Sequence, residues 1–77
     1  MAVGFVLINA APAKERELKE KLESIDEVIE VYPLFGEWDL IVKIETETLK
    51  LLGQTIVDKI RSIAGVIDTK TLTGAEL

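Results

Sequence analysis

The chain repeats one pattern twice, an apolar strand-like run joined to a helix with a single apolar stripe. The segments Ser24–Leu34 (SIDEVIEVYPL) and Ser62–Leu72 (SIAGVIDTKTL) each run from the end of such a helix into a strand. The resulting order is βαββαβ. Right-handed crossovers then place the first and third strands in the centre of the sheet, with both helices on one face. The sequence therefore predicts an α+β, ferredoxin-like βαββαβ fold with a four-stranded antiparallel sheet.

The element boundaries follow from prolines, glycines and capping residues. Pro12 suits the first turn of the first helix, and Gly65 ends the second, which Thr46 or Thr48 caps. Pro33 cannot donate to a strand ladder, so the second strand lies at a sheet edge. The predicted strands are Val3–Ala10, Asp26–Phe35, Asp39–Glu45 and Val66–Thr73, and the predicted core stripe of the second helix is Leu49, Leu52, Ile56, Ile60 and Ile63.

Two strands are apolar on both faces, although two helices cover only one face of a sheet. The first strand presents Val3, Phe5 and Leu7 on one face and Ala2, Val6 and Ile8 on the other. The second opposes Ile29, Val31 and Phe35 to Val28, Tyr32 and Leu34. A second copy packed sheet to sheet, as in dimeric α+β barrels, would cover the remaining face. The alternative is that these side chains stay exposed.

Composition also indicates an oligomer, and it excludes several classes of protein. A chain of 77 residues buries only about 60% of its unfolded surface, and without cysteine or histidine no disulfide or zinc site supports it. We therefore expect an oligomer. A net charge of −5 and the absence of a basic run argue against direct nucleic-acid binding. A membrane-spanning helix needs about 20 apolar residues in a row, and the chain has no such run. We therefore expect a cytoplasmic protein.

Few groups are available for catalysis. Lacking histidine and cysteine, the chain cannot form the common nucleophile–base pairs, and most of its acids lie on helix surfaces beside lysines. No acidic loop has the oxygen-ligand spacing of a calcium site. We expect no catalytic residues, no metal and no cofactor.

One stretch, PLFGEWDLIVKI, places a glycine, two acids and the only tryptophan between two apolar runs. A ligand with both an ammonium and a carboxylate needs an anionic acceptor close to exposed backbone N–H groups. Gly36 lets the backbone be approached closely, and Asp39 can accept from an amino group beside the indole of Trp38. A hairpin turn capped by Asp39 explains the same residues. The residues alone leave both readings open.

The stretch VYPLFGEWDLIVKIET, with an ERELKEKL-type helix before it, resembles the RAM (regulation of amino acid metabolism) domain of Lrp/AsnC regulators. The resemblance covers essentially the whole chain and implies a single RAM/ACT-like ligand-binding domain over residues 1–77. It also implies dimerisation through the sheet, assembly of dimers into rings, commonly octamers, and amino-acid effectors bound between dimers.

The resemblance further implies a set of ligand-binding residues. Gly36 and Asp39 match the G-x-x-D segment of the family, with Glu37 and Trp38 between them. Hydroxyl residues of the last strand contribute to the pockets of the family, and Thr69, Thr71 and Thr73 stand at such positions. Threonine is also an ordinary strand former. Because the chain begins with the first RAM strand, we expect a stand-alone RAM protein without a DNA-binding domain, with full-length Lrp/AsnC regulators as further partners.

Three functions remain to be distinguished. The leading hypothesis is an amino-acid-sensing module without enzymatic activity, built from dimers that bind the effector between them. The second is a small dimeric α+β-barrel enzyme of the monooxygenase or isomerase type, against which the lack of histidine counts. The third is a structural subunit that forms a ring and binds no amino acid.

Overall fold

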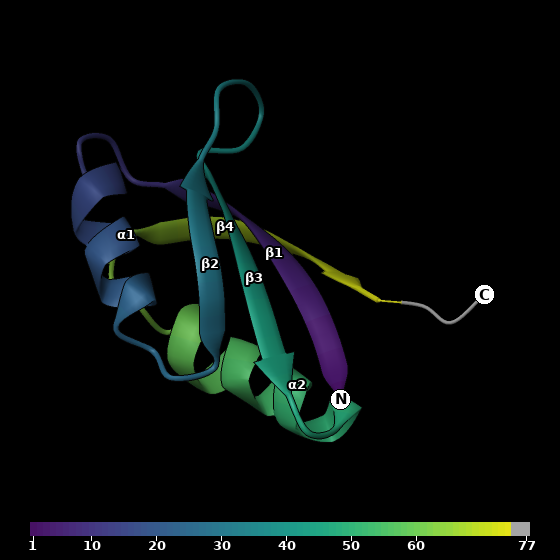
Figure 1. Ribbon diagram of the computed structural model, residues 1–77. Coiled ribbons are helices and arrows are strands. Elements are labelled where there is room, and N and C mark those ends of the chain that lie inside the picture. The colour runs from purple at the N-terminus through teal and green to yellow at the C-terminus, as the bar shows by residue number, and fades with distance from the viewer. Residues whose placement is uncertain (75–77) are drawn as a thin grey trace.

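Both helices lie on one face of a four-stranded antiparallel sheet with the order β2-β3-β1-β4 (Figure 1). The computed structural model describes residues 1–74. The strands are β1 (Ala2–Ala10), β2 (Val28–Pro33), β3 (Leu40–Thr46) and β4 (Val66–Thr73). The helices are α1 (Glu15–Glu23) and α2 (Leu49–Thr55), which continues as the π-helix η1 (Ile56–Ile60). The predicted fold class is confirmed, with β1 and β3 central and Pro33 on an edge strand.

The two helices begin differently from one another. Pro12 is not in the first turn of α1, because Ala13 has a φ of 66° and cannot continue a right-handed helix. Lys14 is instead the N-cap residue, and its side chain makes no capping hydrogen bond. For α2 the prediction is confirmed at Thr48, whose Oγ1 accepts from the backbone N–H of Leu51 at 3.1 Å.

Helix α2 packs against β1 at a glycine. A Cβ at Gly4 would lie only 3.0 Å from Leu52 Cδ2, so glycine lets the helix approach the strand closely. Leu52, Ile56 and Ile60 are buried as predicted. The prediction was wrong for Leu49, which is 65% exposed, because the first turn of α2 projects past the sheet.

The second helix also ends earlier than predicted. Its regular part stops at Ile60, and Arg61 closes it by donating to the carbonyl of Ile56 at 2.9 Å. Gly65, with a φ of 101°, lies in the turn that leads into β4. Its carbonyl accepts from the N–H of Ala11 at 2.7 Å, which ties this turn to the end of β1.

Strand β2 departs from simple alternation. The register with β3 shifts between Val28 and Glu30, and this bulge puts Val28 and Val31 on the same, helix-covered side. Ile29, predicted to share a face with Val31, is 50% exposed. Leu34 and Phe35 lie beyond the strand. Apolar side chains therefore lie on both faces of this strand, as predicted, but the predicted assignment of residues to the two faces was wrong.

In the part of the chain that the structure describes, no helix is long and apolar enough to cross a membrane.

The core lies between the helices and the sheet, where apolar side chains of β1, β3, α1 and η1 pack together. The fully buried members include Val6, Ile8, Leu18, Leu22, Val42, Ile44 and Ile60.

Candidate functional site

The sheet face without helices is lined by apolar side chains of all four strands, and we call it the open face. Its register places Phe5 beside Lys43 and Leu72, and Leu7 beside Ile41. Tyr32 and Leu72 are 55% and 46% exposed, whereas Val6 and Ile8 on the helix side are fully buried. The apolar residues of the open face are Val3, Phe5, Leu7, Tyr32, Ile41 and Leu72.

Charged groups are interspersed on the open face. A hollow of about 160 Å³ is lined by Phe5, Ile41, Tyr32, Glu30 and Lys43. The Tyr32 hydroxyl donates to the Glu30 carboxylate, a hydrogen bond that raises the pKa of Tyr32. Lys43 Nζ lies 3.8 Å from the same carboxylate. Glu30, Tyr32 and Lys43 thus satisfy one another at the centre of this hollow, whereas Lys70 beside Leu7 and Glu45 beside Val3 add charge elsewhere on the face.

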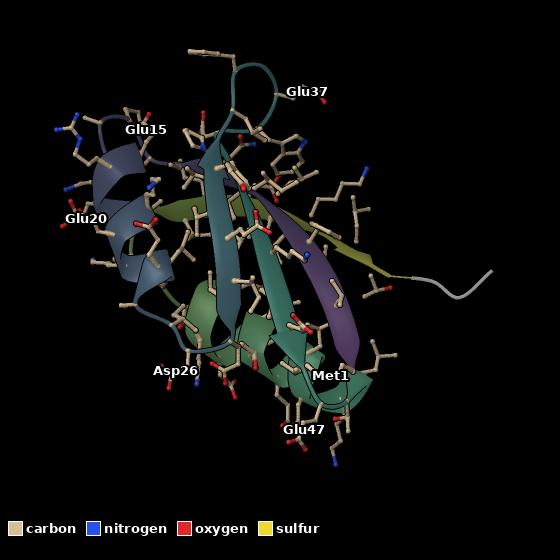
Figure 2. The ribbon with its side chains drawn as sticks, in the orientation of Figure 1. Met1, Glu15, Glu20, Asp26, Glu37 and Glu47 are labelled. Carbon is tan, nitrogen blue, oxygen red and sulfur yellow. The ribbon has the colours of Figure 1, made fainter. Side chains whose placement is uncertain are left out.

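The predicted ligand-binding segment forms a loop from Leu34 to Asp39, which we call the 34–39 loop. It projects beyond the ends of β2 and β3, with Glu37 pointing outward (Figure 2). Gly36 has a φ of 116°, a conformation that favours glycine, and no atom lies within 4 Å of where a Cβ would stand. Trp38 is half-buried, while Gly36 and Glu37 are exposed.

Asp39 joins this loop to the end of β1. Its Oδ2 accepts from the backbone N–H of Ala10 at 2.8 Å, and its own N–H donates to the carbonyl of Ile8 at 2.9 Å. Its carbonyl accepts from the N–H of Leu34 at 2.8 Å, closing the loop. The contact with Ala10 is one that the sequence does not signal, because it joins residues 29 positions apart.

The three threonines of β4 line up on one face of the strand, opposite Ile8, Val6 and Gly4 of β1. That face is the helix side of the sheet, not the open face. Thr69 lies at the same end of the sheet as the 34–39 loop, because its neighbour Ile8 also pairs with Leu40. Thr71 and Thr73 lie about 7 and 13 Å further along the strand. The structure thus brings Thr69 toward the loop and leaves the other two away from it.

A hollow of about 410 Å³ adjoins the loop between α1 and the end of β2. Its lining includes Arg16 and Lys19, two cations on a helix surface that otherwise resembles an ordinary solvated face, and Leu40, the residue directly after Asp39. The sequence pattern gives no signal for these cations, because periodicity alone does not distinguish them from the other charged residues of α1.

The opposite end of the sheet is acidic. A hollow of about 370 Å³ there is lined by Met1, Asp26, Glu27, Glu45 and Glu47, among others; Figure 2 shows Met1, Asp26 and Glu47 far from Glu37. Lys59 Nζ donates to both carboxylate oxygens of Glu27 at 3.0 and 2.9 Å, which holds the pKa of Glu27 below its ordinary value. Residues 1–74 contain no cluster of three acidic side chains suited to a metal ion.

Comparisons with known proteins agree on one family. A family model described as "Lrp/AsnC ligand binding domain" matches residues 3–73. An uncharacterised HTH-type transcriptional regulator of Pyrococcus horikoshii is 37% identical over 71 residues, covering 88% of this chain and 47% of that protein.

Solved structures share the fold over nearly the whole chain. The crystal structure of FFRP-DM1 is similar with a TM-score of 0.94 and 47% identity, covering 97% of this chain and all of that one. The AsnC protein of E. coli has a TM-score of 0.90 at 27% identity, covering 99% of this chain and 52% of that one. The chain thus spans about half the length of the regulators that it matches.

Proposed function

The chain belongs to the Lrp/AsnC ligand-binding domain family, and on this premise we propose that it is a regulatory module that senses an amino acid without catalysing a reaction. The relatives it matches are named as transcriptional regulators, which supports a regulatory role. The proposed ligand-binding residues are Gly36, Glu37, Trp38 and Asp39 of the loop, together with Thr69, Thr71 and Thr73 contributed by a neighbouring subunit.

The observation that carries this proposal is the unused backbone of the 34–39 loop. Within residues 1–74, no hydrogen bond to the protein involves the backbone of Phe35, Gly36, Glu37 or Trp38. A loop with free N–H groups suits the carboxylate of an amino acid. The adjoining hollow is lined by Arg16 and Lys19 together with Glu15, and Lys19 Nζ pairs with Glu23 at 2.9 Å, so Arg16 is the cation that adds positive potential beside the loop. Trp38 offers an apolar surface for the effector side chain.

The proposed assembly starts from a dimer formed through the open face. Six apolar side chains from four strands share this surface, and none of them is covered by α1 or α2. Two copies related by a twofold axis would bury the same residues from each protomer and leave both helical layers outside. The 34–39 loops then stay at the ends of the sheets, accessible to a neighbouring dimer.

The effector, in this proposal, binds between dimers and acts by linkage. A ligand that fits only the pocket completed by two dimers stabilises the assembly that contains this pocket. Full-length Lrp/AsnC regulators, which share the domain, are proposed as partners whose assembly the bound effector would alter.

A thermal-shift screen with the twenty standard amino acids, run beside light scattering, tests the function. At one hundred times its Kd a ligand stabilises a site by about 2.7 kcal/mol, and in a domain of this size each kcal/mol raises Tm by about 4–8 °C. We expect one or a few amino acids to raise Tm and to change the particle size, and their carboxamide derivatives to do neither. If no amino acid raises Tm and the assembly forms regardless, the chain is a structural subunit.

A further inference from the structure

Strand β1 extends beyond its central partner. The last pair between β1 and β3 is Ile8 with Leu40, so Asn9 and Ala10 have no strand beside them on that edge. Ala10 is only 9% exposed, and its N–H group therefore needs an acceptor other than bulk water. The Asp39 carboxylate supplies it at 2.8 Å, where a longer β3 would have offered a carbonyl.

The same residue closes the loop with its own backbone. Asp39 donates to the carbonyl of Ile8 and accepts from the N–H of Leu34, so the 34–39 loop is fixed to β1 and closed on itself at one position. Between these bonds, Gly36 is exposed at a φ of 116°, no atom lies within 4 Å of where its Cβ would stand, and its backbone makes no hydrogen bond within residues 1–74. The conformation of the loop thus depends on its attachment at Asp39.

We propose that Asp39 is a positioning residue, which acts on the effector through the loop that it fixes to Ala10 and not by pairing with the amino group of the effector. This inference rests on the proposed function and refines it. The expectation from sequence, in which Asp39 accepts directly from an ammonium group, requires the negative charge. The positioning role requires only an oxygen that accepts the Ala10 N–H, and an asparagine side chain provides one.

Two substitutions at this position separate the roles. Asp39→Asn keeps an acceptor for Ala10 and removes the charge, whereas Asp39→Ala removes both. Glu37→Gln is the matched control for the exchange measurement, because it removes from the same loop a carboxylate that makes no hydrogen bond in the described structure. Each of the twenty standard amino acids is titrated singly into the wild-type protein and the three variants by calorimetry, and exchange of the Ala10 amide is followed by NMR without ligand.

We expect Asp39→Ala to speed exchange of the Ala10 amide by about tenfold or more and to weaken amino-acid binding by a similar factor. Asp39→Asn should restore protection of Ala10 and bind within about threefold of wild type, since a neutral hydrogen bond replaces a charge-assisted one. Glu37→Gln should leave exchange of the Ala10 amide unchanged. Because Glu37 is itself a proposed ligand-binding residue, this variant controls the exchange measurement alone.

Two outcomes would overturn the proposal. If Asp39→Asn protects Ala10 like wild type yet binds as weakly as Asp39→Ala, the charge contacts the effector directly. If Asp39→Ala leaves Ala10 exchange and binding unaltered, the loop does not depend on this bond. Failure of the proposed function is recognised separately, because wild-type protein would then bind no amino acid, and the positioning role would fall with it even if Ala10 exchange responded as expected.

Discussion

Replacing Leu72 by alanine measures the contribution of the open face to dimer formation. Leu72 lies beside Phe5 on this face and is 46% exposed in the single chain. Full burial of a leucine side chain stabilises by about 2 kcal/mol, so burying the exposed half contributes about 1 kcal/mol. A twofold dimer contains the residue twice. The substitution should therefore cost about 2 kcal/mol, which raises the dimer Kd about 30-fold.

Sedimentation velocity over a dilution series gives the dimer Kd, and Leu49→Ala serves as the matched control. Leu49 is 65% exposed, but it lies on α2, in the layer away from the open face. It should leave the dimer Kd within about twofold of wild type. Equal Kd values for wild type and Leu72→Ala, or a larger effect of Leu49→Ala, would show that the copies associate through another surface.

Three further changes test the local structure through the urea dependence of unfolding. Gly36→Ala should lower the free energy of unfolding by about 1–2 kcal/mol. The cause is backbone strain at a φ of 116° and not a clash, because the added Cβ meets no atom. A neutral result would mean that the loop adopts another conformation. Thr48→Ala should cost about 1 kcal/mol by leaving the Leu51 N–H without its cap, whereas Thr48→Ser should retain most of it. Because the pKa of Glu27 is held below its ordinary 4.5 by Lys59, its ion pair stabilises above that pH, and this contribution is lost as pH falls through the lowered pKa. Lys59→Met should therefore destabilise at neutral pH and match wild type in acid; a difference that persists in acid would point to packing.

The fold was predictable because its determinants are local patterns. Apolar spacing in β1 and α2 and the position of Pro33 each specify an element or its place in the sheet without long-range information. The cap at Thr48 also follows from nearest neighbours. Consistency among these signals is what made the strand order predictable.

The misses arise where backbone geometry overrides the pattern. The residue type of Ala13 does not predict its φ of 66°. The bulge at Ile29 places the later residues of β2 on the opposite faces from those predicted. The bulge shifts the pattern of β2 by one residue, and simple counting then assigns its side chains to the wrong face. The turn at Ala13 instead places Pro12 outside α1 and leaves the buried stripe of Leu18 and Leu22 as predicted.

The position of the candidate loop was predictable, but its contacts were not. Family resemblance selected Gly36 and Asp39, and both lie in one exposed loop. The hydrogen bond from Ala10 to Asp39 and the separation of Thr73 from the loop depend on how β1 and β4 align. Such register is a property of the assembled sheet and not of any short segment.

The closure of the 34–39 loop at a single residue has a consequence for how such a domain can change. Asp39 and Leu34 carry the attachment, Gly36 makes the turn and Trp38 is half-buried, so Phe35 and Glu37 are the fully exposed side chains between the two ends of the loop. These two side chains can be replaced by others, large or small, apolar or polar, while the sheet beneath is undisturbed. A scaffold of this kind can diversify its recognition from one copy to the next without having to refold.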